Sequence, residues 1–284
     1  MNNGRHQNAR HQDARHQNAR HQNAHGYVTD EIWRYTVSGT PPEAISKSGK
    51  LVRRDDATAR FSQTIYPARE VALMPGRLDP RLVAFHDFDP KAIAPYNRLV
   101  ISLISAAASR GLQRLLIASA QYGDGRTSVT LNLAAALARA GQRVLFVETD
   151  FLRPSALRLL GVDVETGLAE AIAAGLAPSR AMVWLQPVGF NLLPTRAQVE
   201  NSAELLASPV FEAMLEMLKP EYDFILFDSA PLLAVADASL LELHTDATLL
   251  VIRPGRTSVR QMSRAVAQLN EERLLGIVLN RAAA

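Results

Sequence analysis

The chain has 284 residues, 48% of them hydrophobic, which is enough for one large domain or two small ones. It contains no cysteine, so disulfide bridges, thiolate metal sites and cysteine nucleophiles are excluded. The formal net charge of +3 belongs to residues 1–26, and because the rest of the chain is neutral we expect no nucleic-acid partner.

An Arg-His-Gln repeat with a period of five residues fills residues 1–26. This period keeps neither a helical nor a strand face, and almost no apolar side chain is present, so we predict a disordered tail. Capture of a metal ion by its histidines is the alternative to a bland, solvated tail. These histidines are His6, His11, His16, His21 and His25.

Residues 27–85 contain few periodic apolar positions and are expected to form a linker or N-terminal extension, followed by one domain over residues 86–284. No apolar run reaches the ~18–20 residues that a membrane-spanning helix needs. The first residues also lack the apolar core of a secretory signal, so we expect a cytoplasmic protein.

Short aliphatic runs alternate with longer amphipathic segments from Leu112 onward. Strands are predicted at Leu115–Ser119, Val144–Glu148, Phe190–Pro194, Phe224–Asp228, Ala247–Ile252 and Gly276–Asn280. Helices are predicted at Ser128–Ala140, Ala203–Leu218 and Ser258–Asn270. The alternation predicts an α/β fold with a mainly parallel, doubly wound sheet. Ligands of such sheets bind beyond the carboxyl ends of the strands, here after Ser119, Val147 and Phe227.

The first of these loops has the composition of a phosphate-binding loop. Its glycines allow backbone N–H groups to turn toward phosphate oxygens, and the helix that follows adds its positive end. Thr127 stands where a hydroxyl would ligate Mg²⁺. The predicted nucleotide-binding residues are Gly123, Asp124, Gly125, Arg126, Thr127 and Ser128. A tight strand-to-helix turn is the alternative for the two glycines.

Acidic residues follow the other two strands. Glu148 and Asp150 are placed to face the same crevice, and Asp228 ends an apolar run, as a residue near a nucleotide-bound metal does. We predict Arg126, Glu148, Asp150 and Asp228 as catalytic residues, with Thr127, Asp150 and Asp228 as the metal set. The alternatives are a cap or turn role for Asp228, solvated strand-end carboxylates for Glu148 and Asp150, and a helix cap for Asp237.

Three sequence motifs carry a family likeness: ASAQYGDGRTS, FVETDFLRP and DSAPLLAVAD. Together with GLAEAI, LLP...AELLAS, VIRPGRTS and GIVLN they resemble the bacterial tyrosine kinases of the exopolysaccharide type. This family lies within the deviant P-loop ATPases, which include the cell-division and plasmid-partition ATPases. The resemblance covers about residues 78–281 and implies ATP or ADP with Mg²⁺ as cofactors.

The chain departs from this family at several positions. Arg126 replaces the lysine of the first motif, and Glu148 replaces an aspartate of the second. The charged anchors of the family's oligomer motif fall on Ala94, Asn97 and Val100. The family's tyrosine-rich tail is absent, because the last tyrosine is Tyr222.

The resemblance therefore implies a degenerate member that binds nucleotide weakly and acts as a regulator or scaffold in exopolysaccharide or capsule synthesis. Its expected partner is a membrane polysaccharide co-polymerase or other exopolysaccharide machinery, which would bring it to the inner membrane, with a homo- or hetero-oligomer as an option. One alternative is a slow but active protein-tyrosine kinase that phosphorylates a partner. Another is a partition-type ATPase.

Overall fold

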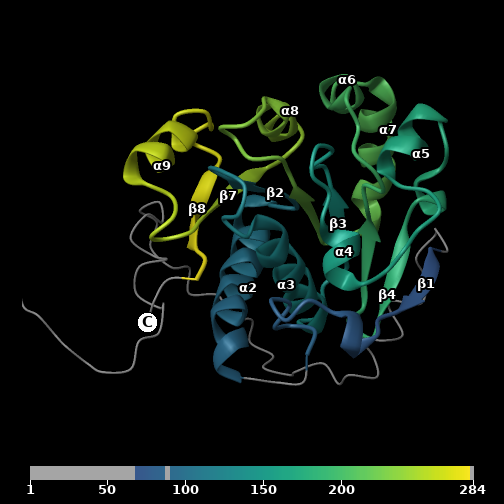
Figure 1. The fold of residues 1–284 in the computed structure, drawn as a ribbon, viewed down its shortest axis with the longest axis horizontal. Helices are drawn as coiled ribbons and strands as arrows, with labels where there is room; N and C mark the ends of the chain where they lie inside the picture. Colours follow the sequence, from purple (N-terminus) through teal and green to yellow (C-terminus); the bar gives the residue numbers. More distant parts are fainter. Residues whose placement is uncertain (1–67, 87–89, 282–284) are drawn as a thin grey trace, which may run out of the picture.

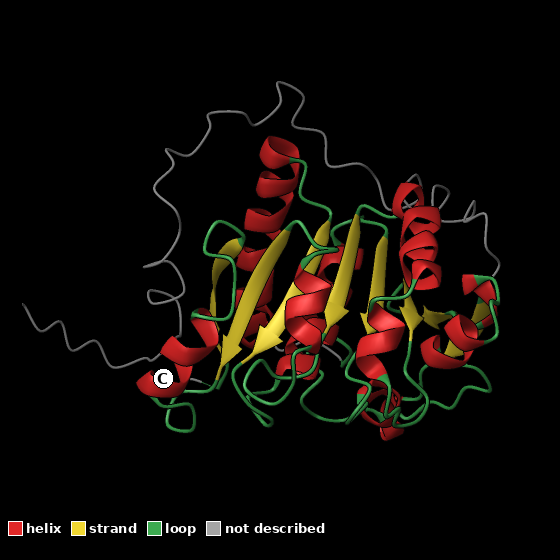
Figure 2. Ribbon diagram, turned by 90° about the horizontal axis from the view of Figure 1, so that it is seen from above, coloured by secondary structure: helices red, strands yellow, loops and turns green. Residues whose placement is uncertain are grey.

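The computed structural model describes residues 68–86 and 90–281. An eight-stranded sheet forms its centre, with helices on both faces (Figures 1 and 2). The repeat tail of residues 1–26, its histidines and residues 27–67 of the expected linker lie outside the described residues.

The strands run in the order β1-β4-β5-β3-β6-β2-β7-β8 across the sheet. All neighbouring strands are parallel except the antiparallel pair β4 and β5. Their bounds are β1 Arg69–Ala72, β2 Arg114–Ser119, β3 Val144–Glu148, β4 Val183–Gln186, β5 Phe190–Leu193, β6 Phe224–Asp228, β7 Ala247–Ile252 and β8 Leu274–Leu279. The predicted α/β fold with a mainly parallel sheet is confirmed.

The described α-helices are α2 Pro90–Arg110, α3 Arg126–Arg139, α4 Ala156–Leu160, α5 Leu168–Ala173, α6 Ser202–Leu206, α7 Pro209–Leu218, α8 Asp237–Glu242 and α9 Val259–Val266. The short 3-10 helices are η1 Pro75–Arg77, η2 Pro178–Arg180 and η3 Lys219–Glu221. The single helix predicted over Ala203–Leu218 is two helices, because Ser208 caps a new helix whose first residue is Pro209. Among residues 68–86 and 90–281, no helix has the length and apolar character that crossing a bilayer requires.

Alternate residues of the central strands enter two separate hydrophobic cores. Leu115 and Ile117 of β2 pack with α2, α3 and α4, whereas Leu116 and Ala118 pack with α5 to α9. This alternation follows from the two-residue period of a strand. Because both faces are covered, the central strands are continuous apolar runs, as the sequence suggested.

Helix α3 is buried from Arg126 to Ala138, between the sheet and an outer layer made by α2 and the segment before it. Asn132 of α3 accepts from the Ala84 amide at 2.9 Å and donates to the Arg81 carbonyl at 2.9 Å. Arg81 and Ala84 precede the domain boundary expected at residue 86, and these contacts make them part of the fold.

The folded part begins earlier than the boundary predicted at residue 86. Arg69–Ala72 forms the parallel edge strand β1 beside β4. The strand is short, mostly exposed and has the sequence REVA, so it lacks the apolar run that identified the central strands. Residues 68–85, which were expected to belong to the linker, are therefore part of the described fold.

Three neighbouring strands bring the predicted loops together. β3, β6 and β2 are adjacent and parallel, with Glu148 opposite Asp228 and Ile117 also opposite Asp228. The loops after these strands consequently leave the same edge of the sheet, as the strand-end rule predicts.

Candidate nucleotide site

The glycine-rich loop leads into the N-terminus of α3. Gly123 and Gly125 have φ values of +89° and +90°, and Gly125 is the N-cap of the helix. These left-handed conformations favour glycine. The first amides of a helix have no partner within it, so this turn presents N–H groups that suit phosphate oxygens.

Two residues from distant loops lie directly against these glycines. A Cβ on Gly123 would lie 2.7 Å from the Arg256 guanidinium, and a Cβ on Gly125 would overlap the side-chain amide of Asn280. Asn280 donates from Nδ2 to the Asp124 carbonyl at 2.7 Å. The glycines therefore allow a close approach as well as a tight turn. Arg256 and Asn280 were missed by the sequence analysis, which had no signal that joins them to this loop.

The predicted binding residues Asp124 and Ser128 hold the loop in shape. Asp124 is fully buried and accepts from Thr257 Oγ1 at 2.7 Å and from the Gln121 amide at 3.1 Å. Ser128 Oγ donates to the Gly125 carbonyl at 3.1 Å. Both side chains are thus engaged within the protein.

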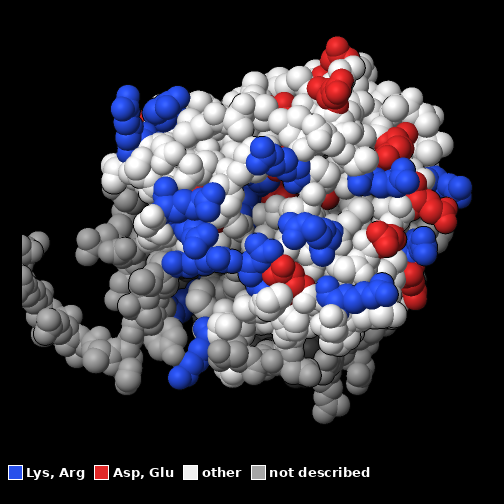
Figure 3. Space-filling view, viewed as in Figure 1, with Lys and Arg blue, Asp and Glu red and all other residues white. Residues whose placement is uncertain are grey.

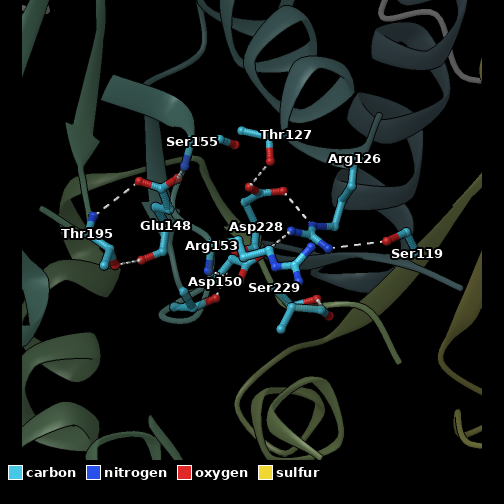
Figure 4. A network of polar contacts seen from close by, with 12 residues as sticks. Ser119, Arg126, Thr127, Glu148, Asp150, Arg153, Ser155, Thr195, Asp228 and Ser229 are labelled. Atoms are coloured by element: carbon cyan, nitrogen blue, oxygen red, sulfur yellow. Dashed lines mark hydrogen bonds and ion pairs between the residues drawn. The ribbon is translucent and has the colours of Figure 1, made fainter. Parts of the chain in front are cut away.

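Arg126 points toward the buried carboxylates of Asp150 and Asp228 (Figure 4). Its Nε lies 2.9 Å from Asp228 Oδ1, and its Nη2 lies 2.7 Å from Asp150 Oδ2. Its Nη1 donates to Ser119 Oγ at 3.2 Å. The guanidinium thereby links the ends of three elements, β2, β6 and the loop after β3. We call these four side chains the Arg126 cluster.

The Arg126 cluster is shielded from solvent: Arg126 is 6% exposed, and Asp228 is 0% exposed. Burial opposes the charge of Arg126, but the ion pairs with Asp228 and Asp150 outweigh it and raise the pKa of the guanidinium. A charged Arg126 is therefore a structural counter-ion for two carboxylates.

The three side chains of the predicted metal set converge on this cluster. Thr127 Oγ1 donates to Asp228 Oδ2 at 2.6 Å, while Asp228 Oδ1 accepts from Arg126 and from Thr130 Oγ1 at 3.3 Å. Asp150 Oδ1 accepts from the Arg153 amide at 3.0 Å, and its Oδ2 accepts from Arg126. Every carboxylate oxygen of Asp150 and Asp228 already accepts a hydrogen bond, and the Arg126 guanidinium bridges the two carboxylates. These residues do not fit a Mg²⁺ ion held directly by Asp150 and Asp228 while Arg126 keeps this position.

Glu148 stands outside the Arg126 cluster, although it is opposite Asp228 in register. Its carboxylate accepts from the amides of Ser155 at 2.6 Å, Ala156 at 2.8 Å and Thr195 at 3.2 Å. Burial raises its pKa to about 8, although the amide hydrogen bonds act in the opposite direction. Glu148 was expected to face the crevice, but its carboxylate contacts the start of α4 instead. The side chain of glutamate is one methylene group longer than that of aspartate, which gives it this reach.

Asp237 is the first residue of α8 and is only 3% exposed. The residue before it, Ala236, occupies the N-cap, so the capping role given as an alternative for Asp237 is not observed. Within the described part of the chain, its Oδ2 is buried without a hydrogen-bond partner. Burial raises the pKa of this carboxyl group. A hydrogen bond with the Ser202 side chain acts in the opposite direction.

Two other arginines remain exposed around the loop mouth. Arg153 lies over the Tyr122 ring, with its Cζ 4.4 Å from the ring centroid, and Arg256 donates to the Tyr122 carbonyl at 3.2 Å. Figure 3 shows basic side chains gathered across the centre of this face of the molecule. Positive charge thus remains accessible at the mouth, although Arg126 itself is buried.

The chain is similar to known proteins in sequence and in fold. The family model described as "AAA domain" matches residues 113–273. Tyrosine-protein kinase YwqD of Bacillus subtilis is 28% identical over 196 residues, which make up 68% of this chain and 83% of that protein. Tyrosine-protein kinase etk of Escherichia coli is 32% identical over 169 residues, which make up 58% of this chain but only 23% of that longer protein.

The solved kinase domain of the E. coli tyrosine kinase ETK has the same fold. It superposes with a TM-score of 0.64 at 24% identity, over 82% of this chain and 97% of the solved chain. The matched family model, the relatives and the glycine-rich loop at the edge of a parallel sheet agree, and the chain belongs to the AAA-domain family of P-loop ATPases, within its branch of bacterial tyrosine kinases.

Proposed function

We propose that the protein is a tyrosine-kinase-like, nucleotide-binding regulator of exopolysaccharide or capsule synthesis with impaired catalysis. The single observation that carries this proposal is the position of Arg126, which pairs with Asp150 and Asp228 instead of facing the loop mouth. The likeness to bacterial tyrosine kinases supports the assignment to this class.

Nucleotide binding is supported by the composition and backbone geometry of the glycine-rich loop and by the arginines beside it. The glycine-rich turn, the N-terminus of α3 and the exposed Arg153 and Arg256 suit the phosphates of ATP or ADP. Since the residues of the Arg126 cluster do not fit Mg²⁺, we expect the metal to add little to nucleotide affinity.

Impaired catalysis follows from two features of the Arg126 cluster. The guanidinium of Arg126 is paired with two carboxylates, so its charge is not directed at the transferring phosphate. Phosphoryl transfer depends on charge positioned at that phosphate. The same contacts occupy Asp150, so this carboxylate is not free to accept a proton from an attacking hydroxyl. Loss of one well-placed charge commonly lowers a rate about a hundredfold.

The proposed partner is a membrane polysaccharide co-polymerase or another part of the exopolysaccharide machinery, which would bring a cytoplasmic protein to the inner membrane. In this arrangement the nucleotide acts as a conformational ligand. Transfer of phosphate to a partner's tyrosine is the competing function, and measurable turnover by the native chain would favour it.

The test is calorimetric titration of the full chain with ATP and ADP, each in Mg²⁺ and in a chelator, for the native protein and Arg126→Lys. We expect the native chain to bind both nucleotides with an affinity that changes less than about threefold on Mg²⁺ removal. In Arg126→Lys we expect Mg²⁺ to strengthen ATP binding and phosphate release to rise about a hundredfold. Failure of both proteins to bind nucleotide would overturn the proposal.

A further inference from the structure

A second basic site lies outside the glycine-rich loop. A pocket of about 840 Å³ opens between η1, α4 and the segment after β5. Arg77 of η1, Arg158 of α4 and Arg196 after β5 line it, together with the apolar side chains of Leu157, Val162 and Val164. None of the lining residues belongs to the glycine-rich loop. We call this cavity the arginine pocket.

Charge in the arginine pocket is unbalanced. Asp163 is the acidic residue among the lining side chains, against three guanidinium groups. Within residues 68–86 and 90–281, neither Arg77 nor Arg158 has a carboxylate at ion-pair distance. Arg196 reaches Glu170 at 3.8 Å, but both side chains are substantially exposed, so this pair is weak.

The walls of the arginine pocket are fixed by backbone contacts. The Asp79 amide donates to the Leu159 carbonyl at 2.9 Å, which ties the segment after η1 to α4. Gly161 ends α4 with a φ of +65°, and a Cβ at this position would lie 2.5 Å from the Arg77 Cβ. The absence of a side chain at Gly161 therefore lets Arg77 approach the end of α4.

The third wall is held by Glu148. Thr195 donates from its amide to Glu148 Oε2 at 3.2 Å and from Oγ1 to the Glu148 carbonyl at 2.7 Å. Arg196 follows directly in the chain, so its backbone is anchored to β3. The three arginines thus project from separate, fixed elements toward one cavity. Figure 3 shows basic side chains over the part of this face where α4 lies in Figure 1.

We propose that the arginine pocket binds a small molecule that carries a diphosphate group joined to a less polar moiety. Planar guanidinium groups recognise phosphate oxygens by paired hydrogen bonds, and three of them from different directions match two adjacent phosphates better than one carboxylate. The volume suits a ligand of nucleotide size, and Leu157, Val162 and Val164 offer a surface for its less polar part.

The arginine pocket also adjoins the nucleotide site. Pro154 lines the pocket, while Asp150 and Arg153, earlier in the same loop, face the glycine-rich loop. The pocket and the glycine-rich loop are therefore connected by one segment, residues 150–154. This site does not depend on the proposed nucleotide function, because it uses other residues.

The test uses inorganic pyrophosphate as the probe and backbone amide NMR of the full chain as the readout, at constant ionic strength. We expect saturable chemical-shift changes at Val162, Val164 and Arg196. The pyrophosphate affinity derived from them should be at least tenfold weaker in Arg77→Gln/Arg158→Gln. A control with the same loss of charge, Arg110→Gln/Arg264→Gln, alters two exposed arginines elsewhere and should leave these shifts unchanged.

Shifts at Gly123 and Gly125 report binding to the glycine-rich loop in the same spectra and should persist in both double variants. An unchanged affinity at Val162 and Val164 in Arg77→Gln/Arg158→Gln would overturn the proposal. So would equal shifts with sulfate, which would show a general response to anions. Preserved amide spectra away from the pocket establish that the variant is folded.

Discussion

The Arg126 cluster and the arginine pocket use the same side chain in opposite ways. Arg126 is buried and satisfied by Asp150, Asp228 and Ser119. Arg77 and Arg158 are exposed and have no carboxylate partner among the described residues. An arginine therefore indicates an anion site only when its charge remains uncompensated, and a motif position alone does not reveal this.

The largest effect is expected from removing the counter-ion of the buried cluster. Arg126→Ala leaves Asp150 and Asp228 buried without a cation, so we expect a loss of about 3–5 kcal/mol in the free energy of unfolding. Urea denaturation followed by circular dichroism measures it. A loss below about 1 kcal/mol would mean that Arg126 is not the counter-ion of these carboxylates.

Glu148 connects the two regions, since it stands opposite Asp228 and holds the Thr195 wall of the arginine pocket. Its pKa of about 8 in the folded protein exceeds the ordinary value of 4.5, so the folded state holds the proton more tightly than the unfolded state. The resulting stabilisation is complete below pH 4.5 and is lost as the pH rises toward 8.

Glu148→Gln removes this titration. We expect the stability of the native chain relative to the variant to fall by about 2–3 kcal/mol between pH 5 and pH 8, as measured by urea denaturation at each pH. The exposed residue change Glu204→Gln serves as the matched control. A difference that stays constant or rises with pH would contradict the protonated state of Glu148.

A smaller effect is expected when two glycines with positive φ values are compared. Gly125 and Gly255 have φ values of +90° and +74°, but only Gly125 has a close neighbour where a Cβ would lie, namely Asn280. Alanine at either position introduces backbone strain of about 1 kcal/mol. We expect Gly125→Ala to cost about 1 kcal/mol more than Gly255→Ala in thermal or urea unfolding, and equal costs would show that Asn280 adjusts freely.

The smallest effect is expected in the arginine pocket. Arg77→Gln/Arg158→Gln removes two exposed charges that form no ion pair with the described residues, so the free energy of unfolding should change by less than about 0.5 kcal/mol. Urea denaturation beside Arg126→Ala makes the contrast direct. A loss close to that of Arg126→Ala would mean that these side chains stabilise the fold and are not reserved for a ligand.

The central part of the fold could be predicted from the sequence because its strands are buried on both faces. Val144–Glu148, Phe224–Asp228 and Ala247–Ile252 are observed with the predicted bounds. β1 and β4 were missed, since they are four-residue strands at or near the sheet edge with exposed positions. The long helix α2 was not assigned either, because Pro95 interrupts its pattern.

The location of the site could also be predicted, but the direction of its key side chains could not. Ligands of parallel sheets bind at the carboxyl ends of the strands, which predicted that Arg126, Asp150 and Asp228 lie at one edge of the sheet. Which way Arg126 turns depends on Ser119, Asp150 and Asp228 together, and which amides Glu148 meets depends on Thr195, which lies 47 positions along the chain. Such contacts between distant residues leave no local sequence pattern.

A crystal structure of the native chain with bound ADP tests most directly the claim that Arg126 serves the acidic cluster and not the nucleotide. We predict that its guanidinium stays within hydrogen-bond distance of Asp150 and Asp228 while the ADP phosphates lie on the amides of the glycine-rich loop. A guanidinium turned toward the β-phosphate, with the two carboxylates released, would contradict the account and restore Arg126 to the role of the missing lysine.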